Sequence, residues 1–160
     1  MRALGVVVLL GLVAYVVQSG STLGATPQEL PFERFTVDLT SAAQQDEFVV
    51  VRTTEELARM WQLHAKPATP GIEPQQPPGV DFGKRIMVAF FGGGSVCEPY
   101  RITRVLQYST KTTVEITHRV MGETCTCITI FAPSIEVVSI PRVGEPIDYV
   151  IKSVRTDCDR

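Results

Sequence analysis

The chain has 160 residues, with 15 Lys and Arg against 17 Asp and Glu, which gives a net charge of −2. A nearly balanced chain without a basic block is not expected to bind nucleic acid or an anionic lipid surface. The length corresponds to a single domain with a core of its own once a leader segment is set aside.

The first 25 residues have the layout of a secretory signal peptide. Arg2 supplies the positive start, residues 3–17 carry no charge, and residues 18–25 are small and polar. We therefore predict export to the periplasm, the cell envelope or the medium, with cleavage after Ala25. The alternative is an uncleaved anchor, which would be the chain's only contact with a membrane. Residues 26–160 then form one secreted, β-rich domain.

Two strands are predicted before the only convincing helix. In residues 31–40, apolar residues alternate with polar ones, which is typical of a strand with one buried face. Residues 48–51 are apolar throughout and predict a second strand. The stretch 66–79 contains five prolines, which favours a stiff surface loop. A ligand motif for a groove is the less favoured alternative for this stretch.

The helix is predicted from its cap and its apolar face. Thr53, followed three residues later by Glu56, fits a capping box, and Pro67 ends the helix. Four residues fall at helical spacing on one face: Leu57, Met60, Trp61 and His64. We expect Trp61 to anchor the core and His64 to pack or cap, in preference to a ligand-binding or catalytic role.

The rest of the chain is predicted to be organised around residues 80–100. Residues 86–91 form an apolar run that predicts a strand with both faces covered. The glycines that follow, Gly92, Gly93 and Gly94, predict a turn through backbone angles that a β-carbon forbids. Further strands are predicted at 100–108, 112–120, 127–131, 135–140 and 149–154. The fold class is therefore α+β and mainly β: an antiparallel sandwich or partly open barrel of about eight strands with one amphipathic helix.

Four cysteines follow the signal peptide, which predicts two disulfides. They are Cys97, Cys125, Cys127 and Cys158. On a strand, Cys125 and Cys127 would point to the same face with Cα atoms about 6.6 Å apart, which disfavours a bond between them. Cys97 then takes one of the two and Cys158 the other, and both such pairings remain open. A zinc site and a redox Cys-x-Cys pair are the less favoured alternatives.

No pattern of catalytic residues is found. The sequence has no Gly-x-Ser-x-Gly elbow and no metal-binding histidine pair, because His64 and His118 are its only histidines. His118 shares its predicted strand face with Val114 and Ile116. The glycine cluster is followed by neither a lysine nor a helix, as a phosphate loop would require. We expect no cofactor, no metal and no enzymatic activity.

Four segments carry a resemblance to a known family. They are VVVRTTEELARMW, VDFGKRIMVAFFGG, Tyr100-Arg101-Ile102 and FAPSIEVVSIPR. Together they resemble the C-terminal domain of the PrcB family, bacterial secreted proteins described as protease-complex stability subunits. The resemblance covers Phe48 to Tyr149. The family usually has a Thr-Gly-Gly-Tyr-like turn after the central strand, whereas here residues 95–99 separate the glycines from Tyr100.

The resemblance implies a non-enzymatic secreted module that binds or stabilises another extracytoplasmic protein, with a protease as one such partner. From the sequence we place binding in the glycine-rich turn, because positioned loops on rigid scaffolds commonly carry it. The candidate binding residues are Gly92, Gly93, Gly94, Glu98 and Tyr100. The alternatives are a protease inhibitor that presents residues 92–100 as a loop, and a small thiol-redox protein that uses Cys125 and Cys127.

Overall fold

The computed structural model describes residues 26–37, 39–40, 45–64, 66–67, 75–93, 95, 97–127 and 134–158. The signal-peptide prediction for residues 1–25 lies outside this part of the chain. Residues 128–131 of the predicted strand 127–131 and the glycine at position 94 also lie outside it.

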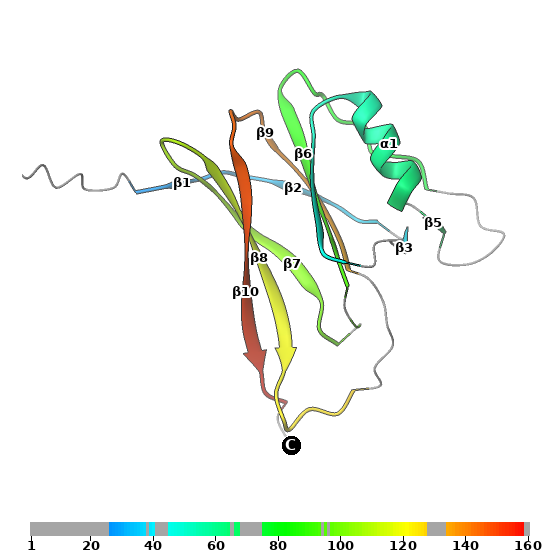
Figure 1. The fold of residues 1–160 in the computed structure, drawn as a ribbon, viewed down its shortest axis with the longest axis vertical. Helices are drawn as coiled ribbons and strands as arrows, with labels where there is room; N and C mark the ends of the chain where they lie inside the picture. The colour runs from blue at the N-terminus through cyan, green and yellow to red at the C-terminus, as the bar shows by residue number, and fades with distance from the viewer. Residues whose placement is uncertain are drawn as a thin grey trace, which may run out of the picture.

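Within this part of the chain, two four-stranded sheets make a mainly β sandwich with one helix and no closed barrel (Figure 1). Sheet A has the strand order β1 (Gln28–Glu29), β7 (Tyr100–Gln107), β8 (Thr112–Met121) and β10 (Ile147–Thr156). Sheet B has the strand order β2 (Glu33–Phe35), β9 (Ser134–Pro141), β6 (Arg85–Gly92) and β4 (Glu47–Val51). The short strands β3 (Leu39–Thr40) and β5 (Lys66–Pro67) pair with each other.

One strand pair departs from the predicted antiparallel arrangement. β10 runs parallel to β8, in a register from Ile147 opposite Thr112 to Thr156 opposite Met121. Between these two strands the chain crosses to sheet B and forms β9 there. It then returns to sheet A and forms β10, which runs in the same direction as β8. Parallel neighbours in a sheet need a crossover connection of this kind.

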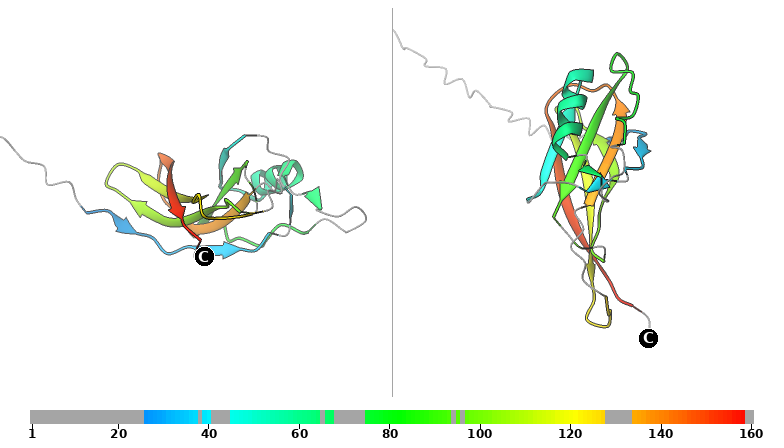
Figure 2. Two further views of the ribbon diagram at one scale, coloured as in Figure 1. Left: turned by 90° about the horizontal axis from the view of Figure 1, so that it is seen from below. Right: turned by 90° about the vertical axis from the view of Figure 1, so that its right-hand side faces the viewer.

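The central strand is β6, as the apolar run predicted. Residues 86–91 are buried on both faces, because one face packs between the sheets and the other packs under the helix α1 (Thr54–His64). The core between the sheets holds Ile86, Val88, Phe90, Ile102, Val105, Val114, Ile116, Val138 and Ile140. The core under α1 holds Val51, Leu57, Met60, Trp61, Met87, Ala89, Phe91 and Val137. Figure 2 shows α1 lying along sheet B on the face turned away from sheet A.

The cap and the buried face of α1 are confirmed. The Glu56 amide donates to Thr53 Oγ1 at 3.1 Å, while the Glu56 carboxylate accepts from the Arg52 amide at 2.6 Å. Trp61 is buried, and its Nε1 donates to the Gln75 carbonyl at 2.6 Å. His64 is also buried and stacks on Phe91 with ring centroids 3.9 Å apart, which is the packing role predicted for it.

Two predicted segments are divided differently. The strand predicted over 31–40 is two short strands, because β2 pairs with β9 whereas β3 leaves sheet B and pairs with β5. β5 lies at the start of the proline-rich stretch, which was predicted to be loop throughout. β1, which was not predicted, pairs with β7. Next to it, the side chain of Leu30 is buried and the Leu30 amide donates a hydrogen bond to the Val105 carbonyl, and these two contacts hold the segment in place.

Candidate functional site

Two disulfides bring three distant segments together at one end of the sandwich. Cys97 is bonded to Cys127 and Cys125 to Cys158, so the prediction of two bridges without a 125–127 bond is confirmed. The bridges join the loop before β7, the turn after β8 and the end of β10, which lie together near the C-terminus in Figure 1. We call residues 97–100, 122–127 and 156–158 the braced end.

Hydrogen bonds fix the turn of the braced end to β10. The Gly122 amide donates to the Thr156 carbonyl at 2.9 Å. The Thr124 hydroxyl lies between two backbone groups of Cys158, donating to its carbonyl at 3.0 Å and accepting from its amide at 3.2 Å. These hydrogen bonds attach the turn to the end of β10 and satisfy the backbone groups that take part in them.

The predicted loop is held to β8 through its backbone and one carboxylate. Glu98 accepts from the Met121 amide at 3.2 Å, and the Pro99 carbonyl accepts from the Arg119 amide at 3.1 Å. The Glu98 amide in turn donates to the Ser95 carbonyl at 3.1 Å, which closes a short turn. Glu98 is half-buried and Pro99 is exposed, so the loop presents its tip while its flanks belong to the sheet.

Tyr100 is the aromatic centre of this region. Its ring stacks on His118 with centroids 4.1 Å apart and planes 6° apart, and it also contacts Phe90 at 5.2 Å. Burial raises the pKa of the Tyr100 phenol, and the negative charges of Asp46 and Glu98 raise it further. A phenol hydroxyl can both donate and accept a hydrogen bond.

Gly92 has a different role from the one predicted. It is the last residue of β6, pairs with Ser134 and is buried, so it lies in the sheet and not in a turn. A β-carbon there would stand 2.7 Å from Tyr100 Cδ2 and 2.8 Å from Phe90 Cε1. Its residue type is thus dictated by the two rings above it. Gly93 begins the loop, and its amide donates to Asp46 Oδ1 at 3.2 Å.

We expect Gly92→Ala to lower the free energy of unfolding by about 1–3 kcal/mol, because the added methyl group overpacks the Tyr100 and Phe90 rings. Urea unfolding followed by circular dichroism measures this loss. Gly79→Ala is the matched control, since a β-carbon at Gly79 meets nothing within 4 Å. Equal stability of the two variants would contradict the role given to Gly92.

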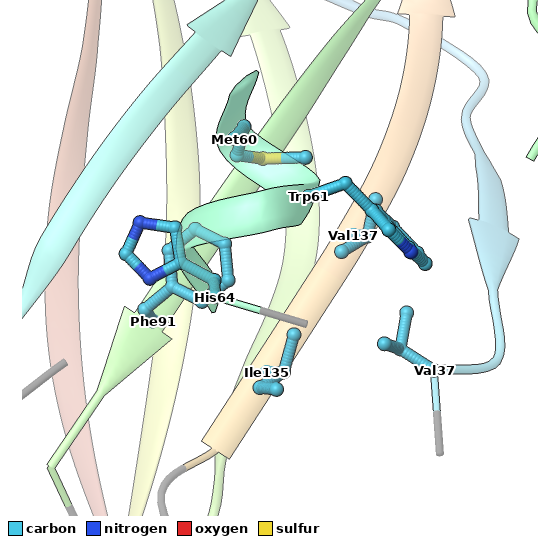
Figure 3. Close-up of a pocket in the computed structure, with 7 residues that line it drawn as sticks. All are labelled: Val37, Met60, Trp61, His64, Phe91, Ile135 and Val137. Atoms are coloured by element: carbon cyan, nitrogen blue, oxygen red, sulfur yellow. The ribbon is translucent and has the colours of Figure 1, made fainter. Parts of the chain in front are cut away.

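A small pocket between α1 and sheet B lies away from the braced end and is too small for a ligand. It offers about 10 Å³ to a water-sized molecule, and one water needs about 10–15 Å³. Figure 3 shows its lining between α1 and sheet B. The lining residues are Val37, Met60, Trp61, His64, Phe91, Ile135 and Val137. We interpret it as a packing gap beside Trp61.

The described residues do not form a metal site or a redox pair. No three His, Cys, Asp or Glu side chains within them are placed to hold a metal ion. Cys125 and Cys127 are bonded to Cys158 and Cys97, whereas a Cys-x-Cys redox couple would bond these two to each other. In the same part of the chain, no helix is long and apolar enough to cross a bilayer.

Sequence reasoning missed the turn 122–127 as part of the candidate surface. Glu123, Thr124, Thr126 and Cys127 are exposed there, beside the exposed Pro99 of the predicted loop. The cysteines were the only available signal, since a bridge from Cys97 to either member of the Cys-x-Cys pair places this turn against the loop. Of the predicted residues, Glu98 and Tyr100 lie close enough for the negative charge of Glu98 to raise the pKa of the Tyr100 phenol.

Comparison of the chain with protein-family models, with curated proteins and with solved structures gave no match.

Proposed function

We propose that the chain is a non-enzymatic binding module of an extracytoplasmic compartment, which holds another secreted or envelope protein at its braced end. The observation that carries the proposal is the bracing itself. The loop tip at Pro99 is fixed by a disulfide on one side and by two hydrogen bonds to β8 on the other. A loop that is already ordered loses little conformational entropy when it binds, so such bracing favours affinity.

Two further features support this proposal. The two disulfides are of the kind that persists in an oxidising, extracytoplasmic compartment. Pro99 is exposed at the tip of the loop, next to the aromatic stack of Tyr100 on His118, and Tyr is favoured at the centre of protein interfaces. A secreted protease is the first partner class to test, because of the resemblance to the PrcB family.

The test uses variants that keep the fold while changing the surface. Glu98→Gln retains an acceptor for the Met121 amide, and Tyr100→Phe retains the stack on His118. We expect the double variant to lose at least tenfold in affinity for the protein captured from the host's envelope fraction, as loss of one interface hot spot does. Surface plasmon resonance against that captured protein measures the change.

The matched control is Glu55→Gln with Tyr108→Phe, which makes the same chemical changes at exposed residues on α1 and at the far end of β7. It should bind as the unaltered chain does. A loop variant with full affinity, or a control that loses as much, would contradict the proposal. If the captured protein is a protease, its activity should be measured in the complex. An active protease would indicate that this chain stabilises it, whereas an inactive one would indicate that this chain inhibits it.

A further inference from the structure

The free edge of sheet B lies at β4. Within the described residues β4 pairs with β6 alone, so its other side offers backbone groups to a new strand (Figure 1). Sheet edges are usually protected by shortness, lysine, proline or a bulge. β1 and β2 are only two and three residues long, and β10 carries Lys152 and Arg155. β4 has the sequence EFVVV in an unbroken register, without any of these devices.

The hydrogen-bond alternation shows which groups point outward. The Arg142 amide donates to the Lys84 carbonyl, so even-numbered residues of β6 bond toward β9 and odd-numbered residues toward β4. Since Val49 lies opposite Ala89, Val49 bonds to β6, while Phe48 and Val50 direct their amides and carbonyls to the free side. The Arg52 amide, two residues on, points the same way and is already bonded to the Glu56 carboxylate.

A groove runs beside this edge. It offers about 400 Å³ between β4 and α1 and is lined by Glu47, Val49, Val50, Val51, Glu56, Arg59, Met60, Leu63 and His64. Leu63, which is 65% exposed, adds apolar surface to its wall. A strand added to β4 would direct every second side chain into this groove.

We propose that the occupant is β4 of a second copy of this chain, paired antiparallel about a two-fold axis at Val49. This register places Phe48 of each copy opposite Val50 of the other, and so uses all four outward backbone groups of each strand. Val49 of the second copy, which is half-buried in its own chain, then lies on the groove side, next to Met60 and Leu63. The two sheets B become one continuous sheet of eight strands.

Charge complementarity selects the same register. With Val49 on the axis, Asp46 of each copy lies opposite Arg52 of the other, so two opposite-charge pairs flank the apolar centre. Arg52 already pairs with Glu145 of its own chain at 2.6 Å, so Asp46 would join this pair as a second carboxylate. A shift of two residues in either direction would break both pairs and leave an outward amide and carbonyl unused. An interface that is self-complementary in apolar pattern, hydrogen bonds and charge is the kind that a two-fold dimer requires.

The first test is the oligomeric state of the exported protein by sedimentation velocity over a range of concentrations. We expect a monomer–dimer equilibrium that Asp46→Lys and Arg52→Asp, each alone, weaken by about tenfold, because each sets like charges against each other. An equimolar mixture of the two variants should form dimers again, since position 46 of each copy then faces a residue of opposite charge at position 52 of the other. A fold defect cannot produce this rescue.

The second test fixes the register. Val49→Cys should form an intermolecular disulfide on mild oxidation, because residues opposite each other in a non-hydrogen-bonded antiparallel pair have Cα atoms about 4.5 Å apart. Val50→Cys is the matched control, because Val50 is half-buried like Val49 but faces Phe48 of the other copy and should not cross-link. A monomer at every concentration, an absence of rescue on mixing, or equal cross-linking of the two cysteine variants would each overturn the proposal.

Discussion

Trp61→Ala is expected to lower the free energy of unfolding by roughly 3–5 kcal/mol, as truncation of a large buried aromatic residue does. Trp61 is 8% exposed and lies in the core under α1, with Met87, Ala89 and Phe91 of β6 beneath it. Its removal would join new empty space to the small cavity that it already lines. It would also leave the Gln75 carbonyl without the indole donor.

Chemical unfolding monitored by circular dichroism measures this effect without relying on the lost tryptophan fluorescence. Trp61→Phe keeps most of the buried ring but removes the indole N–H, so its smaller loss separates packing from the hydrogen bond to Gln75. Gln62→Ala, at an exposed position of the same helix, controls for helix propensity and should change little. A Trp61→Ala chain of unchanged stability that had lost its partner would assign Trp61 to binding instead.

The local elements could be predicted because their signals are local. The face of α1 repeats every three or four residues, its cap lies within four residues, and the apolar run of β6 is continuous. β1 could not be predicted, since Gln28 and Glu29 have no apolar alternation and are ordered by a neighbour, Leu30, that is anchored to β7. The parallel pairing of β8 with β10 depends on where the chain goes between them, which no local pattern records.

The sequence predicts where the segment Gly92 to Tyr100 lies in the chain, but not why its residue types are needed. The segment Gly92 to Tyr100 does lead from the central strand to β7, but the residue type at 92 is set by rings whose position depends on the fold. Strand geometry disfavoured a 125–127 bridge and left the two other pairings open. The two pairings are distinguished by the position of Cys158, which lies next to Cys125 because β10 runs parallel to β8.

Removal of either disulfide is expected to cost about 3.5 kcal/mol in the free energy of unfolding. The bridges close loops with sequence separations of 30 and 33, and opening a loop of that length restores that much chain entropy to the unfolded state. Cys97→Ser with Cys127→Ser opens the first, and Cys125→Ser with Cys158→Ser opens the second. Urea unfolding of each double variant against the intact chain measures the two losses.

The two double variants separate stability from binding. The first frees the loop tip at Pro99, while the second frees the end of β10 and leaves the loop bonded to Cys127. Both variants should lose stability, so their affinities are compared at a temperature at which both remain folded. Under the proposed function, the first should then lose more affinity for the captured partner, because its loop must be ordered on binding. Peptide mapping without reduction should recover 97–127 and 125–158 linked peptides from the intact chain and no free thiol. Equal affinities for the two folded variants would show that bracing of the loop does not govern binding.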